Sequence, residues 1–384
     1  MEQWVGTWGA SPAAPVRFVP LDIMAAPAPV QGTIRHRLRV SAGGSHLRLR
    51  LSNETGVEPL LIGGLSIGLA SGNATVRQGT LTRVTFGGRS AIRIMVGAPA
   101  VSDPISLAVS ALEEVIVSVY LPEEFVATPS EGVHRALLAD RGDAAMVEAW
   151  TDAISLAVRP IVTAIAVKPL QLTRVICALG DSVTDGAGGD ACHDRSWTDI
   201  LARRLHERSG KMRYGVVNAG IGGNRLIGTL IGPPALVRLD RDVFATPGVS
   251  HLIVLEGIND IGVGGRTIEG ITYPPTTAEE LIAAYVQIIE RAHERGVRVI
   301  GATLLPFRGA FFFTEEKEQV RLMVNSWIRS GMAFDAVIDF EAIVRDTTDP
   351  STLRTEFDSG DHLHPNHAAY HAMGHGIDLS LFER

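Results

Sequence analysis

Cysteine is almost absent from this chain, which has two cysteines among 384 residues. So few thiols exclude a disulfide framework and a zinc site with four sulfur ligands. Cys177 stands in an apolar run, so we predict that it is buried as a small apolar side chain. Cys192 falls in a predicted loop, where its position indicates no function.

Long apolar runs and runs of basic residues are also missing. No stretch reaches the ~18 apolar residues of a membrane span, and the first residues lack a basic region followed by an apolar one. A net charge of -7 without a dense Lys/Arg run excludes the positive surface that binds nucleic acid or an anionic bilayer. We therefore expect a soluble protein that binds a small neutral or carbohydrate-like molecule. The compartment, cytoplasmic or exported with the signal peptide removed, and the oligomeric state stay open.

Apolar residues, by contrast, make up 46% of the chain, which is enough for a large core. A length of 384 residues exceeds the usual size of a single domain. The hydrophobic pattern changes near residue 170, so we predict one domain over residues 1–170 and a second over residues 171–384.

The first part of the chain has the alternating pattern of half-buried strands. In TIRHRLRVS the residues Arg35, Arg37 and Arg39 share one side of a strand, and HLRLRLS repeats the pattern with Arg48 and Arg50. Clusters of Gly, Ser and Asn separate such runs, as in antiparallel connections. We predict a β-sandwich of about eight strands with a jelly-roll-like topology. Its aromatic residues are few and scattered, so a carbohydrate-binding or substrate-shaping role and a purely structural role both stay open.

The second part alternates strand-length apolar runs with segments whose apolar residues recur every three or four positions. The candidate strands are RVICAL, YGVVNA, HLIVLEG, VRVIGATLL and AVIDF. The candidate helices are SWTDILARRLHER, AEELIAAYVQIIERAHERG and EEKEQVRLMVNSWIRSG. Gly296 ends the second helix, and the third has a predicted buried face of Val320, Val324, Trp327 and Ile328. We predict a three-layer α/β/α domain with a mostly parallel, five-stranded, flavodoxin-like sheet, whose ligands gather beyond the carboxyl ends of the strands.

A GDS tripeptide follows the first of these strands and places Ser182 where the chain turns away from the sheet. A serine there can act as a nucleophile, since backbone N–H groups at the same edge can bind an oxyanion. The tripeptide alone is more typical of a tight turn supported by Asp181 and Gly180.

Two further motifs follow the next strands. The loop VVNAGIGGNRL contains Gly222 and Gly223, which allow the backbone to approach a ligand closely. The segment VLEGIND ends in Asn259 and Asp260, and the Asn259 amide can donate a hydrogen bond to an oxyanion. Each motif also fits a turn or helix cap without a ligand.

The segment DSGDHLHPNH near the C-terminus contains Asp361 and His364, three residues apart. One turn can bring the two side chains together, so that the carboxylate orients the imidazole and the imidazole accepts a serine proton. His367, His371 and His375 recur at four-residue spacing in the same region, and with Asp358 or Asp361 they are an alternative metal site. No Glu lies among them, so the HExxH metalloprotease signature is absent.

Four motifs occur in one order, each after a different predicted strand: GDS with Ser182, the glycine loop with Gly223, GIND with Asn259, and DHLHP with Asp361 and His364. This set resembles the GDSL/SGNH hydrolase superfamily over roughly residues 172 to 380. Within it, the motifs are similar to those of bacterial acylhydrolases and arylesterases related to xylanase-linked esterases. The superfamily name reads Gly-Asp-Ser-Leu, whereas Val183 follows the serine here, at a position of apolar packing.

The resemblance implies Ser182 as nucleophile and His364 as general base, oriented by Asp361. It implies an oxyanion hole made of the Ser182 and Gly223 backbone N–H groups and the Asn259 side-chain amide, with Gly222 as the alternative donor to Gly223. No metal or organic cofactor is implied.

The expected activity is hydrolysis of short-chain acyl esters through an acyl-enzyme, with acetyl esters of carbohydrates as candidate substrates, because no lipase lid is evident. A metal-dependent hydrolase and a non-catalytic carbohydrate-binding protein stay open as alternatives.

Overall fold

The computed structural model describes residues 3–14, 29–130, 134–139, 142–189, 195–208, 210–268, 270–330 and 332–383. The chain divides into two compact units, Met1–Arg174 with Ser209–Val217, and Val175–Arg208 with Asn218–Arg384. Residues 209–217 thus belong to the first unit although the second unit surrounds them in the sequence. The assignment of residues 1–170 to an accessory domain and 171–384 to a catalytic domain stays a prediction.

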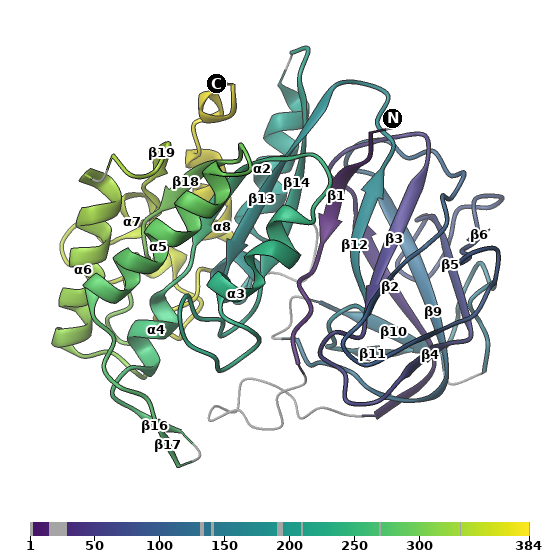
Figure 1. The fold of residues 1–384 in the computed structure, drawn as a ribbon, viewed down its shortest axis with the longest axis horizontal. Coiled ribbons are helices and arrows are strands. Elements are labelled where there is room, and N and C mark those ends of the chain that lie inside the picture. The colour runs from purple at the N-terminus through teal and green to yellow at the C-terminus, as the bar shows by residue number, and fades with distance from the viewer. Residues whose placement is uncertain are drawn as a thin grey trace. The chain divides into compact units, whose positions relative to one another are not determined.

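Two antiparallel sheets and a short strand pair make up the first unit (Figure 1). The four-stranded sheet has the order β1 (Val5–Gly9), β12 (Val162–Val167), β3 (Leu47–Ser52), β8 (Pro99–Val101). The six-stranded sheet has the order β11 (Ile154–Leu156), β10 (Ala136–Ala139), β2 (Pro29–Arg39), β9 (Glu114–Val126), β5 (Gly64–Leu69), β6 (Thr82–Arg83). The remaining pair is β4 (Leu60–Ile62) with β7 (Ile92–Ile94).

The predicted count of about eight strands is therefore too low. Edge strands such as β6, with two residues, are too short to show an alternating pattern in the sequence. The antiparallel, sheet-rich character of this part is confirmed, while the jelly-roll topology stays a prediction.

The predicted alternation of apolar and polar residues along β3 is confirmed. Its three leucines are buried, and the residue after each of them, Arg48, Arg50 and Ser52, is half-buried. On β2 the pattern differs, because Arg35 is buried. Its Nη2 donates to Val147 O at 2.6 Å and its guanidinium lies 3.9 Å from the centre of the Trp150 ring. An arginine that finds carbonyl acceptors and an aromatic face can replace an apolar residue in the interior.

A five-stranded parallel sheet lies in the C-terminal part of the chain, as predicted. Its order is β14 (Arg213–Gly220), β13 (Thr173–Gly180), β15 (Val249–Leu255), β18 (Arg298–Ala302), β19 (Ala336–Ile338). Numbered within the sheet, this is the order 2-1-3-4-5 of flavodoxin-like folds, whose switch point lies between the first and third strands. In this sheet the switch point lies between β13 and β15.

Helices flank the sheet (Figure 1). α2 (Trp197–Glu207) and α7 (Phe340–Val344) pack with α8 (His367–Gly376), while α3 (Ala235–Leu239) and α6 (Glu315–Ser330) pack with α5 (Ala278–His293). The shorter elements are α1 (Ser182–Asp185), α4 (Ile258–Val263), the π-helix η1 (Asp240–Phe244), the hairpin β16 (Thr267–Ile268) and β17 (Ile271–Thr272), and the 3-10 helices η2 (Thr355–Phe357) and η3 (Leu379–Phe382).

A capping box begins each of the two helices α2 and α5. Ser196 and Asp199 form one at α2, and Thr277 and Glu280 form the other at α5. α5 ends at His293, and Gly296 follows with a φ of 67°, the left-handed conformation that glycine permits after a helix.

The buried face of α6 differs from the prediction. Val324 and Ile328 are buried, but Val320 and Trp327 are only half-buried, and Glu318, Arg321 and Asn325 fill the remaining buried positions. Ion pairs make this burial possible, since Arg321 lies 2.6 Å from Glu318 and 2.9 Å from Glu341.

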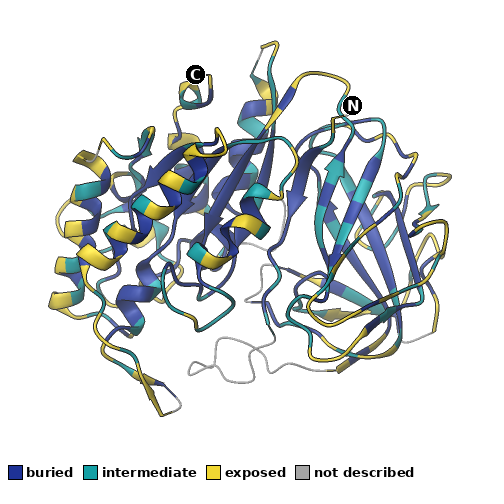
Figure 2. Cartoon of the chain, in the orientation of Figure 1, coloured by how far each residue is buried: buried dark blue, intermediate teal, exposed yellow. Residues whose placement is uncertain are grey.

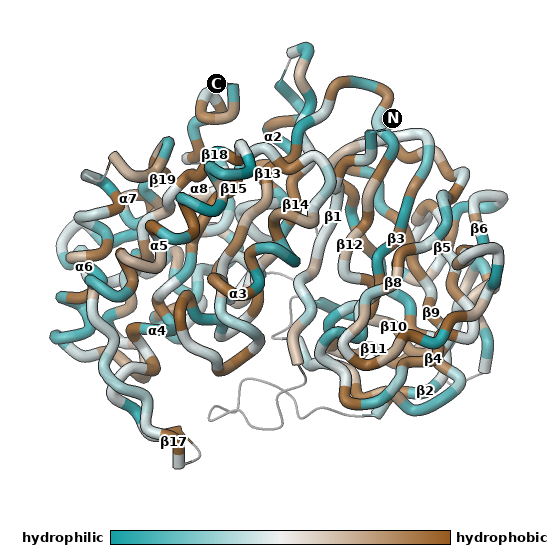
Figure 3. Tube along the Cα trace, viewed as in Figure 1, coloured by the Kyte–Doolittle hydropathy of each residue, from teal (hydrophilic) through white to brown (hydrophobic). Residues whose placement is uncertain are grey.

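Apolar strands form the core of the second unit. From Val175 to Gly180 every residue of β13 is buried, as Figure 2 shows, and the same strands are hydrophobic in Figure 3. Cys177 is fully buried, as predicted, and burial raises the pKa of its thiol well above the ordinary value. Cys192 lies outside the described residues. No helix in the described part of the chain has the length and apolar character needed to span a bilayer.

Candidate active site

Ser182 is the first residue of α1, directly after β13. Asp181 caps this short helix, since its carboxylate accepts a hydrogen bond from Val183 N at 2.9 Å. Gly186 ends the helix with a φ of 107°. Ser182 is 4% exposed, so the GDS segment is a strand-to-helix turn that holds a nearly buried hydroxyl at the sheet edge.

The structure brings Ser182, His364 and Asp361 into one hydrogen-bonded chain. His364 Nε2 lies 2.9 Å from Ser182 Oγ, and His364 Nδ1 lies 2.6 Å from Asp361 Oδ2. The other carboxylate oxygen, Oδ1, accepts hydrogen bonds from the backbone N–H groups of His364 at 2.8 Å and of Leu363 at 3.0 Å. One carboxylate therefore fixes both the imidazole ring and the backbone that carries it.

The surroundings keep Asp361 ionised. Burial would raise the pKa of Asp361, but the hydrogen bond and charge of His364, with the backbone N–H groups of His364 and Leu363, hold that pKa well below its usual range. An ionised carboxylate can accept a hydrogen bond from Nδ1–H, and in that tautomer Nε2 can accept a proton from the Ser182 hydroxyl.

Gly223 and Asn259 follow the two strands beside β13. Gly223 has a φ of 69°, and a Cβ at this position would lie 2.4 Å from Ile231 Cδ1, so no other residue fits without a shift. Asn259 lies in the first turn of α4, and its Nδ2 donates to Asn224 O at 2.9 Å. Ser182, Gly223 and Asn259 thus lie beyond the carboxyl ends of three adjacent strands, β13, β14 and β15.

Three buried charged residues lie around these segments, and of these only Asp260 stands in the GIND motif. The Asp260 carboxylate accepts hydrogen bonds from Leu226 N at 2.6 Å and Ile227 N at 3.1 Å, which holds the glycine loop. Glu256 and Arg238 are fully buried beneath the same segments. Their signal in the sequence is a charged residue within an apolar run, as in VLEG and ALVRL, because such residues are seldom buried without a specific partner.

The histidines of α8 do not form a metal cage. Neighbouring ring centres in the series His367, His371 and His375 are 5.1 and 5.6 Å apart. Among the described residues, no three or more His, Cys, Asp or Glu side chains are arranged to hold a metal ion. Asp358 instead contacts His362, with Oδ2 at 2.6 Å from Nδ1.

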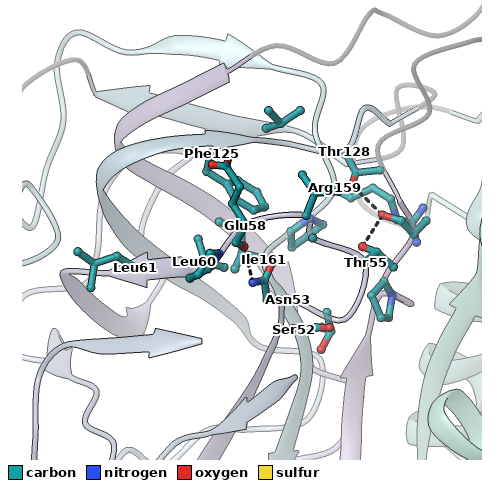
Figure 4. A pocket seen from close by; sticks show the side chains of 18 of the residues that line it. Ser52, Asn53, Thr55, Glu58, Leu60, Leu61, Phe125, Thr128, Arg159 and Ile161 are labelled. Carbon is teal, nitrogen blue, oxygen red and sulfur yellow. Dashed lines mark hydrogen bonds between the residues drawn. The ribbon is translucent and has the colours of Figure 1, made fainter. Parts of the chain in front are cut away.

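A cavity lies in each unit, and neither is lined by a predicted site residue. A cavity of about 320 Å³ in the first unit is lined by residues that include Asn53, Phe125 and Arg159, and by none of the predicted site residues (Figure 4). A cavity of about 10 Å³ in the second unit is lined by Asp181, Val183, Leu255, Ile258, Leu304, Leu305 and Leu363. This lining includes sequence neighbours of Ser182, Asn259 and His364 but none of these three residues themselves.

Three solved structures illustrate what this chain is similar to. A member of the lipolytic protein G-D-S-L family from Veillonella parvula is 21% identical, with a TM-score of 0.39 over 55% of this chain and 99% of its own. A GDSL-like lipase from Bacteroides thetaiotaomicron is 16% identical, with a TM-score of 0.40 over 55% of this chain and 88% of its own. The aryl esterase of M. smegmatis is 16% identical, with a TM-score of 0.39 over 52% of this chain and 94% of its own. A search of curated proteins returned no match.

A sequence model of the GDSL-like lipase/acylhydrolase family matches residues 178–372, about half of the chain. The matched range contains Ser182, Gly223, Asn259, Asp361 and His364. The chain therefore belongs to the GDSL-like lipase/acylhydrolase family and is a hydrolase of the GDSL/SGNH superfamily.

Proposed function

We propose that this hydrolase cleaves short-chain acyl esters with Ser182 as nucleophile, His364 as general base and Asp361 as the group that orients His364. The observation that supports these roles most strongly is the continuous hydrogen-bonded chain from Asp361 through His364 to Ser182. Family membership supports ester hydrolysis in general, and the hydrogen-bonded chain supports the particular residues.

In the proposed reaction, Ser182 Oγ attacks the acyl carbonyl while His364 Nε2 accepts its proton. The tetrahedral intermediate collapses, the bond to the alcohol oxygen breaks, and His364 gives its proton to the leaving alkoxide. Water then attacks the acyl-enzyme with His364 as base again, which releases the acid and restores the Ser182 hydroxyl. Asp361 stabilises the imidazolium that forms in each half of the cycle.

The proposed oxyanion hole consists of Ser182 N–H, Gly223 N–H and the Asn259 side-chain amide. Within the described residues, neither of the two backbone N–H groups donates a hydrogen bond to another group. Donors held by the protein at this edge would bind the oxyanion without prior rearrangement, and one such donor contributes about 3 kcal/mol to transition-state stabilisation.

The proposed substrates carry a short acyl group, with acetyl esters of carbohydrates as candidates. A small cavity of about 10 Å³ in the same unit is lined by apolar side chains such as Ile258, Leu305 and Leu363. Such a volume holds about one water molecule or methyl group. The proposal therefore favours acetyl over longer chains, and it needs no metal or organic cofactor.

The test of the proposed function is the turnover of p-nitrophenyl acetate by Ser182→Ala. We expect turnover to disappear, while Ser330→Ala, at the exposed end of α6, keeps the rate of the unaltered chain. An undiminished rate in Ser182→Ala would contradict the proposal. Exhaustive chelation separates the metal-dependent alternative, because the serine mechanism predicts full activity after chelation.

Chain-length preference is tested with p-nitrophenyl esters from acetyl to octanoyl and with acetylated xylan. We expect kcat/KM to fall as the acyl chain lengthens, and acetate to be released from the polysaccharide. A preference for octanoyl esters would contradict the short-acyl proposal without affecting the role of Ser182.

A further inference from the structure

Arg238 is a buried cation beneath the candidate active site. It lies in α3, and its side chain is 0% exposed. Burying a guanidinium is costly unless its N–H groups find acceptors with good geometry. The acceptors that Arg238 finds lie on the segments that carry Ser182, Gly223 and Asn259.

The first two acceptors are backbone carbonyls at the ends of neighbouring strands. Nη2 donates to Gly180 O at 2.8 Å, two residues before Ser182. Nη1 donates to Ala219 O at 2.6 Å, at the start of the glycine loop. One planar group therefore sets the spacing between the nucleophile turn and the glycine loop.

The third acceptor connects Arg238 with Asn259. Arg238 Nε donates to Asn224 Oδ1 at 2.8 Å, and Asn224 is fully buried. The backbone carbonyl of Asn224 in turn accepts the hydrogen bond from Asn259 Nδ2 at 2.9 Å. The orientation of the Asn259 amide thus depends on a residue whose side chain Arg238 holds.

The Asp242 carboxylate offsets the charge of Arg238, and the Glu256 carboxyl group also lies beside the guanidinium. Asp242 Oδ2 lies 3.0 Å from Nη1, and Glu256 Oε2 lies 3.4 Å from Nη2. Glu256 comes directly after β15, three residues before Asn259, so the third strand end is also joined to the guanidinium. A lysine ammonium would be a point charge and could not reach acceptors on three sides at once.

We propose that Arg238 is the positioning residue of the oxyanion hole, and that its guanidinium holds the ends of β13, β14 and β15 at the spacing that the tetrahedral intermediate requires. This inference rests on the proposed function. The Arg238 guanidinium donates to Gly180, Ala219 and Asn224, so its effect on the reaction passes through these residues. A displacement of about 1 Å in such a site can reduce the rate by about 100-fold.

Arg321 provides a matched control in the same unit. Its side chain is also 0% exposed and ion-paired, with Glu318 at 2.6 Å and Glu341 at 2.9 Å. Its remaining hydrogen bond goes to Leu304 O at 3.1 Å, and within the described residues none of its hydrogen bonds or ion pairs reaches the turn or loops that carry Ser182, Gly223 and Asn259. A role limited to stability predicts the same outcome for Arg238→Lys and Arg321→Lys, whereas a positioning role predicts different kinetics.

The experiment compares both lysine variants for denaturation midpoint, kcat, KM, pH profile and inhibition by a trifluoromethyl ketone, which forms a tetrahedral adduct with the serine. For folded Arg238→Lys we expect kcat to fall by about 10- to 100-fold with KM and the pH profile unchanged, and the inhibition constant to rise by the same factor. Arg321→Lys should keep both kcat and the inhibition constant. Should Arg238→Lys not fold, Asn224→Ala, which removes the Arg238 Nε acceptor, should show the same pair of changes.

The inference would be overturned if folded Arg238→Lys kept both kcat and the inhibition constant. Where Arg238→Lys does not fold, the same result in Asn224→Ala would overturn it. Equal losses of kcat and of inhibition in Arg321→Lys would also overturn it. A failure of the proposed function has a different signature, since the unaltered chain would then lack ester hydrolysis that depends on Ser182.

Discussion

At the scale of single residues, the proposed base and its orienting group come from one short turn. Asp361 and His364 are three residues apart, and the carboxylate binds both the ring and the backbone N–H of His364. Their geometry therefore depends on a few backbone torsions. Ser182 is 182 residues away from His364, so its contact with Nε2 depends on the fold of the whole second unit.

Asn259→Ala tests the oxyanion hole. Removing one donor should lower kcat by about 100- to 1,000-fold and leave KM similar, because the amide binds the charge that develops only in the transition state. Steady-state kinetics with p-nitrophenyl acetate measures both constants. A change confined to KM would make Asn259 a substrate contact and not an oxyanion donor.

Asp361→Asn tests the ionisation of the proposed orienting group. The pKa of Asp361 is lower in the folded protein than in the unfolded chain, so its ionised form stabilises the fold above about pH 4 and this contribution is lost as the pH falls. Urea midpoints from pH 6 to pH 2 should show the unaltered chain losing its advantage over Asp361→Asn towards low pH. A difference that stays constant over this range would contradict the depressed pKa.

Candidate site residues that stand in short motifs could be selected from the sequence. A residue whose partners lie far away in the sequence could not. Ser182, Asn259, Asp361 and His364 each stand in a recognisable segment after a predicted strand. Arg238 stands four residues before Asp242, a spacing that is also typical of an exposed ion pair on a helix. Only the structure shows that its other N–H groups face Gly180, Ala219 and Asn224.

At the scale of secondary structure elements, the strand order accounts for the position of the site. β13 lies between β14 and β15, so the loops after these three strands diverge around the switch point of the sheet. Ser182 comes from the central loop, and Gly223 and Asn259 come from the loops on either side. The alternation of strands and helices thus places these three residues at the same edge of the sheet.

Glu256 predicts how the end of β15 responds to pH. Burial and the charge of Asp181 raise the pKa of Glu256 well above that of the unfolded chain, despite Arg238. The folded protein then binds this proton more tightly, so stability decreases as the pH rises above about 4.3. Glu256→Gln should gain stability relative to the unaltered chain between pH 5 and pH 8, measured as urea midpoints. A relative loss over that interval would contradict the raised pKa.

The buried residues were least predictable where charged side chains occupy interior positions in place of apolar ones. The apolar spacing of α6 indicates Val320 and Trp327 as buried, yet Glu318 and Arg321 occupy the interior because Glu341, on α7, completes their ion pairs. A partner that lies far away in the sequence cannot be recognised from the helix alone. The same limit applies to edge strands, whose pairing is set by their neighbours.

At the scale of the whole molecule, the chain leaves the second unit and returns to it. Residues 209–217 belong to the first unit, where Ser41 Oγ donates to Val216 O at 2.9 Å and accepts from Val216 N at 2.8 Å. The change in sequence pattern near residue 170 indicates two parts. It does not indicate this return, because YGVVNA has the pattern of any strand of the parallel sheet.

Deletion of residues 1–174 tests the importance of this arrangement. The shortened chain lacks the partners of residues 209–217, and the two hydrogen bonds of Ser41 alone contribute about 2 kcal/mol. We expect the midpoint of thermal unfolding to fall by at least about 4 °C. Ser41→Ala should show a smaller decrease in the same assay, and a shortened chain as stable as the full one would contradict the expectation.

The most direct test of the central claim, that Ser182 is an activated nucleophile, is mass spectrometry of the full chain after reaction with a fluorophosphonate. We expect one adduct per chain on the peptide that contains Ser182, with none on this peptide in Ser182→Ala and much slower labelling in His364→Ala, since the imidazole accepts the serine proton. An unlabelled Ser182, or an adduct on a different serine, would contradict the claim.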